Sequence, residues 1–200
     1  MKSIISRRFK GLLPVVIDVE TAGLHADTHA LLELAAVFLA AGEEGKLSID
    51  FTESYHIEPF NGAEIDEEAL SITGIKPHHP FRFAITETQA LQRLFDTIKQ
   101  EMTRHECYRA ILVGHNAWFD LSFILAAAKR TKLRGRLPLH AFTTFDTASL
   151  AGVALGETVL AKAAKRARIP FDITKAHSAI YDAERTAELF CYIANKWRIG

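Results

Sequence analysis

The chain has 200 residues, with 24 Lys and Arg balanced by 24 Asp and Glu, so its formal net charge is zero. This length suits one domain with a substantial core, and residues 1–200 contain no repeat or linker-like stretch that would mark a second domain. Two cysteines exclude a disulfide framework, and the short apolar runs exclude a membrane span, so a reducing cytoplasm is the expected location.

Hydrophobic periodicity and turn residues predict strands and helices in alternation. Strands are expected at residues 12–19, 32–40, 50–58, 110–114 and 142–145. Helices are expected at residues 66–73, 87–105, 117–130, 147–154, 158–167 and 179–197. The first three strands are closely spaced, which indicates an antiparallel meander, whereas helices separate the later strands, which indicates parallel additions. The sequence therefore predicts an α/β fold with a mixed five-stranded sheet flanked by helices.

The first predicted strand ends in two acids. Residues 12–19 are apolar and rich in β-branched side chains, which predicts a strand buried on both faces. Asp18 and Glu20 are two residues apart, so they point to the same face, where they repel each other unless a cation lies between them. Mg²⁺ and Mn²⁺ prefer such carboxylate oxygens, although both acids could simply reach solvent. Gly23 then allows a sharp turn and is expected to admit a substrate closely.

A third acid follows the strand at residues 110–114. Asp120 falls in the first turn of the helix at residues 117–130, at the sheet edge where sites form in α/β proteins. Alternatively, the negative charge of Asp120 only stabilises the positive N-terminal end of the helix dipole. Phe119 has the helical spacing of a core residue, and Trp118 is interpreted equally as a core residue or a functional one.

The last motif combines a histidine with an acid. His177 and Asp182 are five residues apart, which on a helix corresponds to about 140° of rotation, so they cannot share a helical face. Ser178 suits the N-cap of the helix at residues 179–197, which leaves His177 on a preceding loop and Asp182 in the first two turns. A mobile histidine beside metal-bound acids suits a general base that takes a proton from water.

In chain order these motifs resemble the DEDD exonuclease superfamily, in the branch whose last motif is His-x-x-x-x-Asp. Within that branch the chain is most similar to the ribonuclease T family, from about residue 8 to residue 197. The similarity also rests on residues 58–60, 144–156 and 175–182. It implies a ribonuclease H-like fold and a 3′-to-5′ exoribonuclease that trims tRNA precursors and other stable RNAs, releases nucleoside 5′-monophosphates and attacks single-stranded DNA.

The resemblance also implies roles for individual residues. The two divalent ions of the active site, Mg²⁺ or Mn²⁺, would be held by Asp18, Glu20, Asp120 and Asp182, and His177 would be the general base. The positions that contact the substrate's terminal bases would be Leu24, Glu68, Ile72, Phe119 and Phe142. The family has phenylalanine at the first and third of these, so Leu24 and Ile72 are departures from its pattern, and we expect a weaker hold on the terminal bases unless the substitution is neutral.

Family members work as homodimers, in which a basic patch on one subunit holds RNA that enters the active site of the other. By position, the patch residues here are Arg8, Lys10, Arg109 and Arg134. The chain around residues 132–136 does not align cleanly, so the register of Arg134 stays open. Residues 162–168 contain a further cluster of basic side chains, which is interpreted as a solvated helix face.

A DNA-directed 3′ exonuclease of a repair or proofreading type remains the alternative function, because the same acids cut both kinds of strand and no contact to a 2′-hydroxyl can be identified. A nucleic-acid-binding module that had lost catalysis would lack at least one of the five active-site residues, and none is missing.

Overall fold

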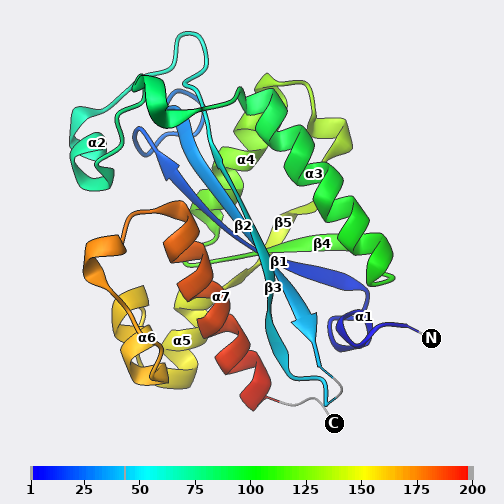
Figure 1. Cartoon of the computed structure of the whole chain (residues 1–200). Coiled ribbons are helices and arrows are strands. Elements are labelled where there is room, and N and C mark those ends of the chain that lie inside the picture. The colour runs from blue at the N-terminus through cyan, green and yellow to red at the C-terminus, as the bar shows by residue number, and fades with distance from the viewer. Residues whose placement is uncertain (1, 43, 198–200) are drawn as a thin grey trace.

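A mixed five-stranded sheet separates two layers of helices (Figure 1). The computed structural model describes residues 2–42 and 44–197. The strands are β1 (Leu12–Thr21), β2 (Leu31–Ala41), β3 (Leu47–His56), β4 (Arg109–Gly114) and β5 (Leu139–Asp146). Their order is β3-β2-β1-β4-β5; β1 to β3 are antiparallel, whereas β4 runs parallel to β1 and to β5. The predicted mixed sheet, with its meander and its parallel additions, is confirmed.

The six predicted helices are all present: α2 (Glu67–Thr73), α3 (Glu87–Arg104), α4 (Trp118–Arg130), α5 (Thr147–Leu155), α6 (Leu160–Ala167) and α7 (Ala179–Lys196). Four short helices were not predicted, because they are too short to show a helical period: α1 (Ile4–Arg8), η1 (Pro80–Arg82), η2 (Arg134–Arg136) and η3 (Ile173–Lys175). Figure 1 shows α3 and α4 on one side of the sheet and α7 on the other, and α5 and α6 pack against α7.

The two central strands of the sheet are buried on both faces, as the sequence predicts for the first. Residues 15–17 of β1 and 34–37 of β2 are all 0% exposed. Burial of this much apolar surface is the main stabilising contribution that a sheet of this kind can draw on. It also makes β1 a rigid support for the two acids near its end, Asp18 and Glu20.

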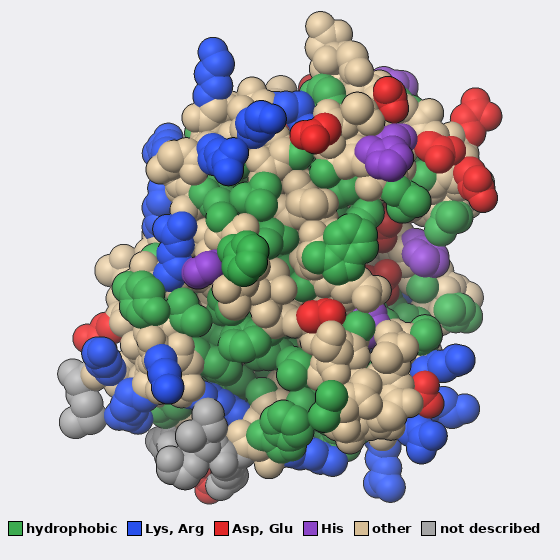
Figure 2. Space-filling view, turned by 180° about the vertical axis from the view of Figure 1, so that it is seen from behind, with side chains coloured by type: hydrophobic (Ala, Val, Ile, Leu, Met, Phe, Trp, Pro, Cys, Tyr) green, Lys and Arg blue, Asp and Glu red, His purple; other side chains and the backbone are tan. Residues whose placement is uncertain are grey.

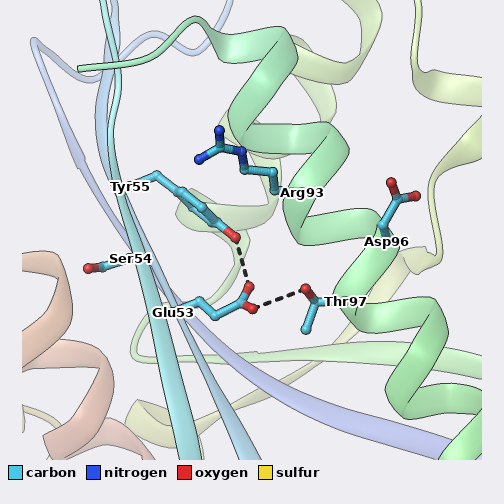
Figure 3. A pocket seen from close by; sticks show the side chains of 6 residues that line it. All are labelled: Glu53, Ser54, Tyr55, Arg93, Asp96 and Thr97. Atoms are coloured by element: carbon cyan, nitrogen blue, oxygen red, sulfur yellow. Dashed lines mark hydrogen bonds between the residues drawn. The ribbon is translucent and has the colours of Figure 1, made fainter. Parts of the chain in front are cut away.

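The edge strand β3 is joined to α3 by side-chain hydrogen bonds. Glu53 accepts hydrogen bonds from the hydroxyl groups of Tyr55 at 2.7 Å and Thr97 at 3.0 Å (Figure 3). Arg93 and Asp96 line the same hollow between the strand and the helix. Burial raises the pKa of the Tyr55 hydroxyl above its usual range, and the nearby Glu53 carboxylate adds to the effect, so this hydroxyl stays a hydrogen-bond donor. This contact fixes α3 against the outer strand.

A buried ion pair ties the loop after β1, residues 22–30, to the helices behind the sheet. Arg130 donates to both carboxylate oxygens of Glu87, at 2.7 and 3.2 Å, and Glu87 is only 5% exposed. The same guanidinium donates to the Ala26 carbonyl at 2.8 Å and lies 4.0 Å from the centre of the Phe60 ring. A planar, fully bonded guanidinium of this kind holds four separate chain segments in one arrangement.

Cys107 and Cys191 are both buried and unpaired, so they form no disulfide framework, as predicted. In the part of the chain that the structure describes, every helix is too short or too polar to cross a bilayer.

Candidate active site

The acids of the first two motifs meet where β1 and β4 end side by side. Asp120, on the first turn of α4, is 4% exposed, and its Oδ1 accepts a hydrogen bond from the Val19 N–H at 3.0 Å. That bond fixes Asp120 between Asp18 and Glu20. Gly114 makes the approach possible, because a Cβ there would lie 3.1 Å from Asp120 Oδ2 and 3.0 Å from the Ala117 Cα. The strand–turn–helix geometry predicted for this motif is therefore what places its acid.

The third motif closes the site from α7. His177 lies just before the helix with φ +64°, and its N–H donates to Asp182 Oδ2 at 2.8 Å. This left-handed turn brings Glu20, His177 and Asp182 together, with one ligand atom from each inside a 4.8 Å group. Ser178 occupies the N-cap position as predicted, but its side chain makes no capping hydrogen bond. The reason is local: the Asp182 side chain folds back over this turn instead.

The site concentrates negative charge where water is scarce. Burial raises the pKa of Glu20 to about 8, and the charges of Asp182, Glu33 and Asp120 contribute. Burial also raises the pKa of Asp120 to about 8, although the Val19 N–H opposes the shift. The pKa of Asp18 lies well above its usual range, again because of burial first and then the neighbouring carboxylates. These acids therefore ionise together at neutral pH only when a cation compensates them.

Asp182 shows most directly that a cation fits. Burial raises its pKa, and the His177 N–H partly offsets this effect. Its Oδ2 is bonded to that N–H, whereas its buried Oδ1 has no hydrogen-bond partner among the described residues. A buried carboxylate oxygen without a partner is costly, and a divalent metal would satisfy it. These carboxylates thus have the chemistry of a site for a divalent cation.

A fifth carboxylate, which the motifs did not reveal, lies next to Glu20 on the neighbouring strand. Glu33 is the residue of β2 that pairs with Glu20, and its charge raises the pKa values of both Glu20 and Asp18. Its Oε1 lies 3.0 Å from Nδ1 of His56 on β3. In the sequence, Glu33 is a single acid near the start of a predicted apolar strand. Only the strand register shows that it lies beside Glu20.

Two further residues brace the turn between β4 and α4. Asp146, at the end of β5, accepts hydrogen bonds from the N–H groups of Asn116 at 2.9 Å and Ala148 at 3.0 Å. His115 lies between Thr147 Oγ1 at 3.0 Å and the Thr158 carbonyl at 2.8 Å, and burial lowers its pKa. These contacts tie the turn that carries Asp120 to the start of α5.

Three of the predicted base-contacting residues are exposed apolar side chains. Leu24 is 77% exposed on the 22–30 loop, Ile72 is 59% exposed on α2, and Phe142 is 91% exposed on β5. Glu68 is exposed on α2, one turn before Ile72. The loop and the helix move as one unit, because main-chain hydrogen bonds join residue 66 to residue 22 and residue 64 to residue 28, both at 2.8 Å.

Phe119 and Trp118 behave differently from each other. Phe119 is half-buried and packs on the core beside Phe123, with the ring centres 5.0 Å apart. Trp118 is 68% exposed and meets the Phe119 ring edge-on at 5.8 Å. The core interpretation of Trp118 is therefore wrong, because its side chain is exposed at the start of α4, about 200° around the helix from the buried Asp120. An exposed indole at this position is available to a ligand.

Gly23 has a packing role that the sequence did not predict. Its φ is +155°, and a Cβ there would lie 1.9 Å from Cδ2 of the His29 ring. His29 is 9% exposed, and its Nδ1 lies 3.2 Å from the N–H of His25. The glycine therefore admits a histidine of its own loop, and the Leu24 loop keeps its shape through this internal packing.

The predicted basic patch lies at the other end of the sheet. Arg109 begins β4 and pairs with Leu12, and Lys10 precedes β1, so about ten residues, or roughly 30 Å of strand, separate them from Glu20. Arg8 is half-buried and donates to the carbonyls of Gly45, at 2.9 Å, and Ala194. Figure 2 shows Lys and Arg side chains along the edge away from α2, and acidic side chains near α2. Within one chain, the patch and the acids are far apart.

Comparison with known proteins agrees with this geometry. The family model RNase_T, described as an exonuclease, matches residues 15–190. Ribonuclease T of Cronobacter sakazakii is 55% identical over 194 residues, which cover 97% of this chain and 86% of that protein. Ribonuclease T of Shewanella denitrificans is 52% identical and that of Vibrio vulnificus 53%, and each match again covers 97% of this chain and 85% and 89% of the relative.

Solved structures give the same fold. Escherichia coli exonuclease I in complex with a dT13 oligonucleotide superposes with a TM-score of 0.70 at 18% identity, over 91% of this chain and 41% of that one. The zinc-bound form of an exonuclease I complex with single-stranded DNA gives 0.69 at 17% identity, over 92% and 41%. The chain thus spans about 41% of exonuclease I, and the likeness confirms the predicted ribonuclease H-like fold.

The raised pKa values of the site predict how stability depends on pH when chelators remove metal. Glu20 and Asp120 titrate near 4.5 and 3.8 in the unfolded chain and near 8 in the folded protein. Folding therefore takes up protons, so their contribution to stability is complete below about pH 4 and is lost as the pH rises through about 8. In EDTA we expect the melting temperature to fall from pH 5.5 to 8.5, and to fall less in the Asp120→Asn variant.

The difference between parent and variant isolates the site from other titrating groups, such as His115. Added Mg²⁺ should raise the melting temperature of the parent more at pH 8.5 than at pH 5.5, because metal binding displaces protons. Identical pH slopes for parent and variant in EDTA would contradict the assignment of these protons to the site.

Proposed function

The chain belongs to the ribonuclease T family of exonucleases, and we propose that its acids at the ends of β1 and β4 hold two divalent ions that promote phosphodiester hydrolysis. The chain is a 3′-to-5′ exoribonuclease, a hydrolase of phosphodiester bonds. The observation that carries the proposed mechanism is the buried, unpartnered Oδ1 of Asp182 beside Glu20 and His177. Relatives with over 50% identity along nearly the whole chain support this assignment of the catalytic centre.

The metal ligands in this proposal are Asp18, Glu20, Asp120 and Asp182. When bound, the ions stabilise negative charge on the phosphate and lower the pKa of a water molecule. The chain contributes the geometry: the Val19 N–H holds Asp120, and the His177 N–H holds Asp182. Mg²⁺ is the expected metal, with Mn²⁺ as an alternative that the same oxygen ligands accept.

His177 acts as the general base. Its imidazole takes a proton from the attacking water, and the water oxygen bonds to phosphorus. The bond from phosphorus to the preceding 3′ oxygen breaks, and that oxygen takes up a proton from solvent. The products are a nucleoside 5′-monophosphate and a chain shortened by one nucleotide with a free 3′ hydroxyl. Its exposed position on a single turn before α7 gives the ring room to approach the water and to withdraw after transfer.

The proposed substrates are 3′ ends of tRNA precursors and other stable RNAs, and single-stranded DNA. A DNA-directed role in repair or proofreading is the second candidate, favoured by the solved exonuclease I complexes with DNA oligonucleotides, which share the fold. Side-by-side digestion of RNA and DNA strands of one sequence with free 3′ ends separates the two, since a DNA-directed enzyme would cut the DNA faster.

The homodimer is part of the same proposal. The roughly 30 Å between the basic patch and the acids of one chain is too far for both to hold the same terminal nucleotides. A second copy that brings its patch to the site of the first would provide positive charge beside the RNA backbone. Arg8, Lys10, Arg109 and Arg134 are the residues we assign to it, in the cytoplasm where RNA substrates would be met.

Removal of the proposed base tests the mechanism. His177→Ala should slow single-turnover cleavage by about 10²–10⁴-fold, the usual range for a general base, while RNA binding changes little. Asp120→Asn serves as the reference variant, because loss of a metal ligand should nearly abolish cleavage and leave the fold intact. A normal rate with weakened binding in His177→Ala would make His177 a substrate contact instead.

Subunit mixing tests the dimer. An Asp120→Asn subunit has a dead site and an intact patch, whereas an Arg109→Ala, Lys10→Ala subunit has an intact site and a damaged patch. Each homodimer should cleave poorly, and the mixture should regain one working site per heterodimer. An active monomer in sedimentation, together with no gain on mixing, would show that each chain works alone.

Substitution of the aliphatic residues Leu24 and Ile72 tests how the terminal bases of the substrate are held. Stacking on an aromatic ring contributes about 1–3 kcal/mol per base, which Leu24 and Ile72 cannot supply. A Leu24→Phe, Ile72→Phe variant should bind RNA about 10-fold more tightly and should change the dependence on the last base. Four RNAs that differ only in the 3′ base provide the comparison, and equal affinities and base profiles for parent and variant would show that the departure is neutral.

A further inference from the structure

Two exposed phenylalanines lie outside everything assigned so far. Phe81 is 76% exposed and Phe83 is 82% exposed, both on the segment between α2 and α3. Single exposed apolar residues need no explanation, but these two large rings lie two positions apart. The exposed apolar residues near the acids, such as Leu24 and Trp118, already have a place in the site, so these two rings remain to be accounted for.

The backbone beneath one of these rings is strained. Phe83 has φ +50° and ψ 38°, in the left-handed region. That conformation is uncommon for residues other than glycine, asparagine and aspartate, and it is an outlier for a bulky side chain. An exposed ring gains little packing to offset the strain. Strained conformations persist where the surroundings enforce them, and they cluster at ligand-binding sites.

The surroundings do enforce this turn, and they place it at the catalytic end of the sheet. Arg82 donates to the carbonyls of Ile57, at 3.0 Å, and of Leu32. Main-chain hydrogen bonds of 2.9 Å join Ile85 to residues 56 and 58 on both sides of the end of β3. In Figure 1 the segment crosses between α2 and α3 near the end of β1. The turn is thus a rigid extension of the sheet edge.

The distance to the acids follows from the strand register. Glu20 on β1 pairs with Glu33 on β2, and Glu33 pairs with His56 on β3. Neighbouring strands are about 4.8 Å apart, so this row spans roughly 10 Å. Arg82 binds the chain immediately beside the outer two residues of the row, and the charge of Glu33 influences its pKa, although burial lowers that pKa overall. The turn therefore lies within a few nucleotides of the cleaved bond.

The turn also forms one wall of a hollow of suitable chemistry. Three prolines, Ala84 and the Phe83 ring line this hollow together with Glu58, His78 and His79, so its surface is at least as polar as it is apolar. The His79 ring lies 5.7 Å from the Phe81 ring, centre to centre. Flat rings and prolines with few fixed charges suit the face of a nucleobase, which stacks without regard to sequence.

We propose that residues 77–84, which we call the aromatic turn, bind bases of the single-stranded segment that lies upstream of the nucleotide being removed. This assignment rests on the proposed function of the acidic site. The occupant is nucleic acid because the turn continues the edge along which the substrate strand must leave the acids, and because its side chains offer stacking surfaces. It would hold long substrates and have no contact with very short ones.

The length of the substrate tests the aromatic turn. Two variants remove the rings: Phe81→Leu keeps apolar volume without a π-face, and Phe83→Asn suits the left-handed backbone. In the double variant, the Kd for a single-stranded RNA of 20 nucleotides should rise about 10-fold, whereas the KM and kcat for a 4-nucleotide RNA should be unchanged. The melting temperature of Phe83→Asn should be equal or higher, because strain is relieved. Val153→Ser, which removes another exposed apolar side chain, is the matched control.

Crosslinking provides an independent readout. An RNA of 20 nucleotides with 4-thiouridine at single upstream positions should crosslink to the aromatic turn at one or two positions, and not at the terminal nucleotide. Unchanged affinity of the double variant for the long RNA would overturn the proposal, and would leave the turn to a protein partner. Equal losses for long and short RNA would also overturn it. Failure of the wild-type protein to cleave the 20-nucleotide RNA despite normal binding would instead count against the proposed catalytic site.

Discussion

Repulsion among carboxylates in a poorly hydrated site is the constraint on which this structure depends. Water would screen Asp18, Glu20, Asp120 and Asp182 from one another, but burial removes much of that screening and raises the pKa of each acid. The folded chain can keep them together only with bound protons or with cations. The same repulsion therefore favours the binding of divalent cations among these acids.

The fold meets this constraint by placing the acids on its least deformable parts. β1 and β2 are buried on both faces, so the spacing of Asp18 and Glu20 is set by the strand itself. Asp120 is fixed from a different element by the Val19 N–H. His177, in contrast, lies on a left-handed turn outside a helix. Rigid acids and a more exposed histidine match the tasks that we propose for them, because metal binding requires fixed oxygens whereas proton transfer requires an approach to solvent.

Much of this could be predicted from the sequence, because it depends on local patterns. The two-residue spacing of Asp18 and Glu20 gives their shared face, and the five-residue spacing of His177 and Asp182 correctly separates the histidine from the helix. The strands and longer helices were placed to within about three residues, since periodicity defines their interiors better than their ends.

What the sequence did not predict has a common physical origin in neighbours that no local pattern identifies. Glu33 matters because of the register of β2 against β1. The exposure of Trp118 depends on what packs against the start of α4. The close contact of Gly23 with the His29 ring depends on how the 22–30 loop folds back on itself. In each case the missing information was the identity of the neighbour.

Leu24 and Ile72, where the family has phenylalanine, imply that terminal and upstream bases contribute unequally to substrate binding. Leu24 is carried on a loop that Arg130 fixes through the Ala26 carbonyl, so a smaller, non-aromatic side chain there cannot be compensated by movement of the loop. The aromatic turn places two rings farther along the same edge, on a backbone fixed by Arg82. If both proposals hold, more of the binding free energy comes from upstream bases and less from the terminal one. Such an enzyme would distinguish poorly between 3′ bases and would release a substrate once it became too short to reach the turn.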